Sequence, residues 1–401
     1  MSSAASTHPR NAWLDSLDAD ELVLLLVAAV DDVPRFAEWL DTRRLAGGGA
    51  SADDLLATVN QILTPSRRFY DYRQANGYAR EGHDLVQTLH GLAQHASPDL
   101  LRVIERAITL ITRTILKSDD SSGGQSTLVR TLLDAHAEAA RTSSPTLTQA
   151  EQSKLVDWIV KYRYGGTQDF FDPDIVAYAP ALSEKSIARY REAIARVDLG
   201  RYGRYPLTRL AVLDADRDAI VAAHRGEPTN AMLAASIVSD LEEAGLHEDA
   251  VAYARIGIDL ESRGWDRTLI AFLVDDALSR DAGPEAVQLR RDWFTRFPSS
   301  TSFADLRATA SATGHWDDER KTAEQRLAER DPAAFVTYLI TEGRGDTAWT
   351  FAHATRARLT SLDTWLTLCA DRAKTHPVDT LPIYEQVITD TLVDTDVRSY
   401  R

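Results

Sequence analysis

The stretch Glu242-Glu-Ala-Gly-Leu-His-Glu-Asp-Ala-Val-Ala-Tyr-Ala-Arg-Ile-Gly-Ile258 has the pattern of a helix end, a glycine turn and a second helix. Before the glycine, apolar residues fall four apart, at Leu233, Ile237 and Leu241. The second helix carries small residues at the positions that would meet its partner: Ala250, Ala254 and Gly257. Each helix therefore has one apolar stripe that it can bury only against a neighbour.

Glycine turns recur through the second half of the chain, at Gly245, Gly283, Gly314 and Gly343. Their spacings of 38, 31 and 29 residues bracket the period of about 34 residues of tetratricopeptide repeats. The Gly245 and Gly343 turns share flanking alanines (Ala250 and Ala254; Ala348 and Ala352), the Gly314 turn keeps Trp316 and Ala323, and the Gly283 turn is shifted. The sequence predicts helical hairpins that turn at Gly245, Gly314 and Gly343.

The first half of the chain also has helical periodicity. Helices are expected over about 18–30, 34–46, 55–63, 74–95, 98–115, 126–141 and 149–164. The run Leu22–Val30 is expected to be a core helix, and 74–95 is expected to form an antiparallel pair with 98–115. No segment alternates as a strand would. We therefore predict an all-α protein: a helical bundle (1–145), a connecting helical region (146–228) and an α-solenoid of tetratricopeptide-like hairpins (229–401).

Composition excludes several kinds of site. With 45 basic against 60 acidic residues, the net charge is -15, which repels phosphate backbones and argues against a nucleic-acid partner. The single cysteine, Cys369, excludes an intramolecular disulfide or a cysteine-based zinc site. The histidines show no metal-binding spacing, so neither metal nor cofactor is expected. Acidic residues flank Leu22–Val30, which is too short to span a bilayer, so we expect a cytoplasmic protein without a membrane segment.

Catalytic and ligand-binding motifs are missing from the sequence. No Gly-x-Ser-x-Gly nucleophile elbow occurs, and Gly47–Gly49 lacks the lysine and hydroxyl residue of a phosphate loop. In the acidic loop Ser118–Gly124, the twelfth position counted from Asp119 is Arg130, where a calcium-binding EF-hand needs glutamate. The sequence therefore favours a non-enzymatic protein.

Arginine or lysine is interleaved with aromatic residues in three clusters, at 67–73, 161–164 and 201–205. Such residues are enriched in binding hot spots, but they also pack against helix ends, where arginine pairs with carboxylates. Both interpretations remain open from the sequence. The candidate partner-binding residues are Arg67, Arg68, Tyr70, Tyr72, Arg73, Arg201, Tyr202, Arg204 and Tyr205.

Three stretches together resemble an uncharacterised bacterial helical family, the region that lies C-terminal to SWIM zinc fingers: Arg68–Arg73, Lys117–Gly124 and Tyr178–Arg191. The resemblance covers residues 12 to about 395. The Cys-x-Cys and Cys-x-His ligands of the zinc finger have no counterpart here, so the binding attributed to that module is not carried over. The resemblance implies a helical-repeat region that binds a partner.

Two classes of function follow from these observations. The first is a non-enzymatic scaffold or adaptor that binds a partner helix or peptide on the surface of a solenoid. The alternative is an enzyme or small-molecule sensor with a pocket between the N-terminal bundle and the repeats, using Tyr70, Arg73 or Tyr205. An open groove would favour the first class, and a closed pocket with perturbed pKa values would favour the second.

Overall fold

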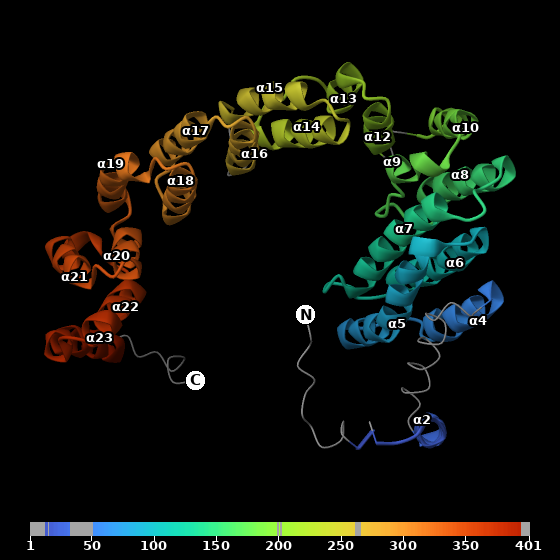
Figure 1. The fold of residues 1–401 in the computed structure, drawn as a ribbon, viewed down its shortest axis with the longest axis horizontal. Helices are drawn as coiled ribbons and strands as arrows, with labels where there is room; N and C mark the ends of the chain where they lie inside the picture. The colour runs from blue at the N-terminus through green and yellow to red at the C-terminus, as the bar shows by residue number, and fades with distance from the viewer. Residues whose placement is uncertain are drawn as a thin grey trace. The chain divides into compact units, whose positions relative to one another are not determined.

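The computed structural model describes residues 13–14, 16–32, 51–198, 200, 203–260 and 266–393. Of these residues, 76% lie in helices and none lies in a β-strand (Figure 1). The prediction of an all-α protein is confirmed. The helix expected over 34–46 and the glycines at 47–49 lie outside the described residues.

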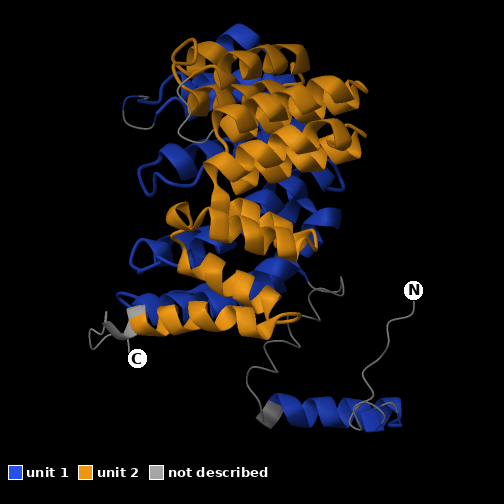
Figure 2. Ribbon diagram, turned by 90° about the vertical axis from the view of Figure 1, so that its left-hand side faces the viewer, with its two compact units in different colours: residues 1–219 blue, residues 220–401 orange. Residues whose placement is uncertain are grey.

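The chain divides into two compact units, residues 1–219 and 220–401 (Figure 2). The boundary differs from the one that the sequence suggested, because most of the expected connecting region belongs to unit 1. Leu155, Ile159, Tyr178 and Tyr190 of that region are buried in the same hydrophobic core as the N-terminal helices. Apolar burial therefore joins residues 146–219 to the bundle rather than leaving them as a separate connecting region.

Unit 1 contains α2 (Ala19–Asp32), α4 (Ala52–Leu63), α5 (Tyr72–Leu92), α6 (Pro98–Ile115), α7 (Gly124–Thr142), α8 (Gln149–Tyr164), α9 (Ile175–Tyr178), α10 (Glu184–Ile194) and α12 (Tyr205–Leu213). Two 3-10 turns, η2 (Ala93–His95) and η3 (Ala179–Ala181), follow α5 and α9. Capping boxes at Ser51, Asp71 and Thr148 begin α4, α5 and α8. These caps satisfy backbone N–H groups that the first helical turn leaves without partners.

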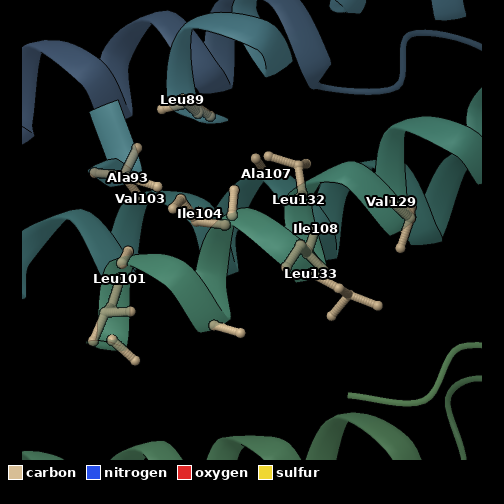
Figure 3. Close-up of a cluster of buried hydrophobic side chains, with 14 of the residues drawn as sticks. Leu89, Ala93, Leu101, Val103, Ile104, Ala107, Ile108, Val129, Leu132 and Leu133 are labelled. Carbon is tan, nitrogen blue, oxygen red and sulfur yellow. The ribbon is translucent and has the colours of Figure 1, made fainter. Parts of the chain in front are cut away.

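Helix α7 lies at the centre of the N-terminal core. It packs against both α5 and α6, whereas α5 and α6 make little direct contact, so the predicted antiparallel pair of 74–95 with 98–115 is wrong. Figure 3 shows side chains of α5, α6 and α7 in this core, among them Leu89, Ile108 and Leu132. Alanines on two faces of α7 are buried (Ala135, Ala137, Ala139 and Ala140), which lets the helix approach neighbours on both sides.

Helix α2 forms where the sequence predicted it, but it is not a core helix. Val23, Leu24 and Val27 are 57%, 70% and 55% exposed, while Leu22 and Leu26 are half-buried. Because Leu22–Val30 is apolar around its whole circumference, no single contact face of this helix could bury all of its apolar residues. In the part of the chain that the structure describes, no helix is long and apolar enough to cross a membrane.

Unit 2 is a series of helical hairpins. Helix α13 (Arg217–Ala223) spans the unit boundary, and it is followed by α14 (Ala231–Glu243), α15 (His247–Ile258), α16 (Asp266–Ser279), α17 (Gly283–Arg296), α18 (Ser300–Ala312), α19 (Trp316–Arg330), α20 (Pro332–Thr341), α21 (Gly345–Ala354), α22 (Leu362–Arg372) and α23 (Leu381–Val393). Short 3-10 turns, η4 (Arg356–Arg358) and η5 (Pro377–Thr380), precede α22 and α23. Neighbouring helices pack in chain order from α14 to α22, an arrangement consistent with the predicted solenoid.

The predicted hairpin turns lie at the expected glycines. Gly245, Gly314 and Gly343 have φ angles of 74°, 76° and 71°, in the left-handed region that costs glycine little. The turn near Gly283 differs, because Asp281 takes the left-handed position with φ 57°, and Gly283 instead begins α17. Ala250, Ala254, Ala348 and Ala352 are all fully buried, so the contact positions inferred from the flanking alanines are correct.

Arginines connect successive hairpins by ion pairs with the acidic residues of the next one. The pairs are Arg255 with Glu285, Arg267 with Asp305, Arg291 with Glu319, and Arg307 with Glu342. Each pair joins helices that hold the same position in successive hairpins, such as α15 and α17, or α18 and the C-terminal end of α20. A planar guanidinium can bind both oxygens of a carboxylate, as Arg291 does with Glu319, which a lysine cannot do.

Gly257 lies at the closest approach between α15 and its neighbours. A Cβ atom at Gly257 would lie 2.5 Å from Cβ of Ala234 and 2.6 Å from Cδ1 of Leu269. Alanine normally stabilises a helix by about 1 kcal/mol relative to glycine. Here we expect Gly257→Ala to lower the free energy of unfolding by about 1 to 2 kcal/mol, because the added methyl overlaps packed atoms. Urea denaturation would measure this change.

Gly91 provides the matched control for Gly257. It also lies inside a helix, α5, but a Cβ there would meet nothing within 4 Å. Gly91→Ala should therefore increase the free energy of unfolding. Equal effects of the two substitutions would show that the α15 contact is looser than the structure indicates.

Candidate functional site

Unit 2 has a groove with a volume of about 700 Å³ along α18 and α20, which one residue of α22 extends. On α18 its lining follows one helical face: Ser300, Ala304, Arg307, Ala308 and Ser311. On α20 it includes Ala333, Ala334, Thr337, Tyr338 and Thr341, and α22 contributes Thr364. Small side chains predominate, so the backbone of a ligand could approach these helices closely.

Aromatic packing makes the floor of the groove rigid. The ring of Tyr338 lies edge-on to that of Phe303, with centroids 4.9 Å apart, and Phe303 packs in the same way on Phe294 and Trp316. Asp331 caps α20 by accepting a hydrogen bond of 3.0 Å from the backbone N–H of Ala334. The groove is therefore largely formed before any ligand binds, which lowers the entropy cost of binding.

Arg307 is the only basic residue in the lining of this groove. Its Nη2 donates a hydrogen bond of 2.7 Å to Glu342, and its guanidinium carbon lies 5.4 Å from the centroid of the Tyr338 ring. Among the described residues, its Nε and Nη1 have no hydrogen-bond partner. A guanidinium that is oriented by two partners and keeps free N–H groups is ready to donate to a carbonyl or carboxylate.

Glu324 lies behind the lining of the groove and binds the hydroxyl of Tyr338. One of its oxygens, Oε1, accepts hydrogen bonds from Arg320 at 2.9 Å, from Tyr338 Oη at 2.8 Å and from Arg344 at 2.8 Å. Partial burial works against ionisation, but these hydrogen bonds outweigh it and lower the pKa of Glu324. Burial is the main cause that raises the pKa of Tyr338, and its hydrogen bond to Glu324 is the second. Glu324 therefore stays ionised and fixes the position of the Tyr338 ring.

The polar groups of the groove suit a peptide better than a reaction. The hydroxyls of Ser300, Ser311 and Thr364 have no hydrogen-bond partner among the residues that the structure describes, so they are free to bind backbone groups. The lining contains no histidine or cysteine, and its one carboxylate, Asp331, is engaged in capping α20. No pair of groups in the groove is arranged as a nucleophile with its base. The arrangement can bind and orient a chain.

Sequence reasoning did not select these groove residues. The signal was present as small residues at helical spacing (Ser300, Ala304, Ala308 and Ser311). Such a stripe is also what a buried helix contact looks like, and only the neighbouring helices decide which alanines are covered. Ala250 is fully buried, whereas Ala304 and Ala308 are exposed.

The first predicted cluster, 67–73, is split between core and surface. Tyr70 is 4% exposed, its ring lies 5.7 Å from that of Tyr78, and its hydroxyl accepts a hydrogen bond of 2.9 Å from the backbone N–H of Ser66. Its placement in the core leaves Tyr70 unavailable to a partner, in contrast to our sequence-based assignment. Arg67, Arg68, Tyr72 and Arg73 are exposed.

Fewer residues of the other two clusters, 161–164 and 201–205, are available to form a binding surface. Arg201 and Tyr202 lie outside the described residues, while Arg204 and Tyr205 are exposed at the start of α12. In the 161–164 cluster, Tyr162 stacks on Trp158 and Arg163 is buried in an ion pair with Asp172. The packing interpretation is correct for Tyr162 and Arg163.

A buried polar network joins α7 to α9 in unit 1. His136 is fully buried, its Nδ1 lies 3.0 Å from the hydroxyl of Tyr178, and its Nε2 lies 3.6 Å from Glu105. Burial raises the pKa of Tyr178 well above its ordinary value, which keeps the phenol protonated. Both rings are buried within the core, so we interpret the network as a structural feature that fixes how α6, α7 and α9 pack.

Comparisons with family models, curated proteins and solved structures found no match to this chain. The resemblance to the region C-terminal to SWIM zinc fingers therefore stays a prediction. Within the described ranges, no group of three or more histidine, cysteine, aspartate or glutamate side chains could hold a metal ion.

Proposed function

We propose that this protein is a non-enzymatic scaffold or adaptor whose repeat unit binds a helix or peptide segment of a protein partner in the α18–α20 groove. The observation that carries the proposal is the groove itself: a preformed hollow of about 700 Å³, lined by small side chains, free hydroxyls and one oriented arginine. Helical-repeat proteins bind partners on surfaces built from successive repeats in this way.

The volume of the groove also supports a second candidate, a small-molecule sensor, because drug-sized ligands occupy pockets of about 300 to 1,000 Å³. The lining favours the peptide. It runs along three helices of successive hairpins and carries its free hydroxyls at separate points, Ser300, Ser311 and Thr364. A chain of peptide groups could use all three, whereas a compact molecule would reach only some of them.

Blocking the groove tests the proposal. Ala308 is exposed in its lining, so Ala308→Trp should fill part of the hollow with little effect on folding. We expect affinity capture from an extract of the source organism to recover a protein that binds wild type and binds Ala308→Trp at least about tenfold more weakly. A peptide from that protein should then bind wild type in a direct titration.

Ala370 provides a matched control, because it is an exposed alanine on α22 outside the lining of the groove. Ala370→Trp should leave the capture unchanged. Equal capture by all three proteins would exclude the groove as the partner site. If wild type recovers a small metabolite that Ala308→Trp does not recover, and no protein differs between the two samples, the result would favour a small-molecule sensor.

A further inference from the structure

An exposed patch of arginine and aromatic side chains surrounds the contact between two distant segments of unit 1. The backbone N–H of Tyr70 donates to the carbonyl of Lys117 at 2.9 Å, and the N–H of Asp119 donates to the carbonyl of Tyr70 at 2.8 Å. Lys117 Nζ also donates to the carbonyl of Arg67 at 2.8 Å. These bonds hold the segment 67–73 beside the C-terminal end of α6.

We name this surface the bridge patch and define it by seven residues: Arg67, Arg68, Phe69, Tyr72, Arg73, Arg113 and Leu116. Phe69, Tyr72 and Leu116 are 60%, 51% and 52% exposed, and the four arginines are exposed too. Arg113 and Leu116 lie about one helical turn apart at the end of α6, next to Lys117, whose backbone carbonyl accepts the hydrogen bond from Tyr70.

The arginines of the bridge patch differ from most others in unit 1. Arg102, Arg141, Arg163, Arg189, Arg191 and Arg209 each form an ion pair with a carboxylate. Among the described residues, the side chains of Arg67, Arg68, Arg73 and Arg113 have no hydrogen-bond or ion-pair partner. Four unpaired guanidinium groups around exposed rings form a local cationic surface on a chain with a net charge of -15.

Two acidic residues lie beside the bridge patch, and both are engaged by the backbone. Asp71 Oδ1 accepts a hydrogen bond of 2.9 Å from the N–H of Gln74 at the start of α5. Asp119 Oδ1 accepts one of 3.3 Å from the N–H of Ser121. These carboxylates therefore shape the two segments and leave the four arginines available to an outside anion.

We propose that the bridge patch binds an acidic peptide segment of a partner protein, one in which carboxylates alternate with apolar side chains. The arginines would bind the carboxylates, and Phe69, Tyr72 and Leu116 would cover the apolar side chains. This site belongs to unit 1 and shares no residue with the α18–α20 groove, so the proposal does not rest on the function proposed above.

Charge distribution favours an acidic peptide over a nucleic acid. A nucleic acid carries a negative charge at every phosphate along its length, so a bound strand would continue from the bridge patch onto a strongly acidic protein. A short peptide confines its charges to a few residues that the four arginines can neutralise. The exposed rings would also stack on bases, so an oligonucleotide belongs among the test ligands.

The test uses the full-length protein and a fluorescent peptide of alternating glutamate and leucine, followed by fluorescence anisotropy. We expect saturable binding that weakens with added salt, and no binding of the same peptide with glutamine in place of glutamate. Arg67→Gln/Arg68→Gln/Arg73→Gln should weaken binding at least about tenfold. Phe69→Ala/Tyr72→Ala should weaken it too, and melting temperatures should change little, because all five side chains are exposed.

A charge-matched control separates the bridge patch from a general charge effect. Lys154, Lys161 and Lys185 are exposed on α8 and α10, so Lys154→Gln/Lys161→Gln/Lys185→Gln removes the same charge elsewhere on unit 1. This variant should bind the peptide like wild type. The proposal is overturned if wild type does not bind, or if the arginine variant binds as wild type does. Equal weakening by the lysine variant, or binding of oligothymidylate in place of the peptide, would overturn it as well.

Discussion

Raising the pH above about 10 should unfold unit 1, because five tyrosines that lie in its core or pack against it stay protonated in the folded chain. Burial is the main cause in each case: it raises the pKa of Tyr162 and Tyr164 to about 12 and raises the pKa of Tyr78, Tyr178 and Tyr190 further. Below about pH 10, these groups are protonated in both folded and unfolded chains. Above it, the unfolded chain loses protons that the folded chain keeps, so the free energy of unfolding falls as pH rises.

The expected loss is large because the contributions add. Each tyrosine that ionises only on unfolding lowers the free energy of unfolding by about 1.4 kcal/mol per pH unit. Circular dichroism would follow helix loss while ultraviolet absorbance follows tyrosinate formation, and the last part of the absorbance change should occur together with the loss of helix. Ionisation of all 13 tyrosines in a protein that keeps its full helicity would contradict the prediction.

Tyr162→Phe tests one of these contributions. The hydroxyl of Tyr162 lies 2.8 Å from the hydroxyl of Thr112, and its ring stacks on Trp158. Phenylalanine keeps the ring but cannot ionise. The slope of the unfolding free energy against pH should fall by about 1.4 kcal/mol per pH unit between about pH 10 and 12. An unchanged slope in Tyr162→Phe would contradict this contribution.

Ala254→Leu should destabilise unit 2 by about 1 to 3 kcal/mol, because it places three additional carbon atoms in a fully packed contact. Ala254 is fully buried on α15, one turn from Ala250 and beside Gly257, where neighbouring atoms leave no room even for a methyl group. Ala254→Ser should be milder, since serine adds only a hydroxyl. Chemical denaturation of each variant would give the difference.

Ala252→Leu is the matched control for Ala254→Leu, because Ala252 is exposed on the same helix. It should change stability by less than about 0.5 kcal/mol. If both leucine variants unfold like wild type, the contact face of α15 is not the one that the structure shows.

Local patterns in the sequence predicted most of the helices and several of their ends. Helix α8 spans Gln149–Tyr164, the range expected from its periodicity and from the glycine after Tyr164. Gly245, Gly314 and Gly343 turn the hairpins as expected, because the left-handed backbone there suits glycine. These features depend on residues a few positions apart, and such residues are visible in the sequence.

The candidate sites depended on which side chains are exposed, and contacts between residues far apart in the chain decide this. Arg68 and Tyr70 are close neighbours in one motif, yet one is exposed and the other is buried. The contact of Tyr70 with Lys117 and Asp119 decides this, since it buries the ring of Tyr70 and leaves the arginines outside. The sequence indicated which residue types to consider but could not say which of them face water.

The sequence by itself determined that this protein is all-α and where its hairpins turn, because helical periodicity and glycine turns are local properties. The tertiary structure decided which apolar and small residues are covered. It buried Ala250 and Ala254 of α15 and left Ala304 and Ala308 of α18 exposed in a groove. It also exposed much of the apolar run of α2 and joined residues 146–219 to the N-terminal core. The physical reason is that burial depends on which elements pack together, and residues far apart in the chain set that packing.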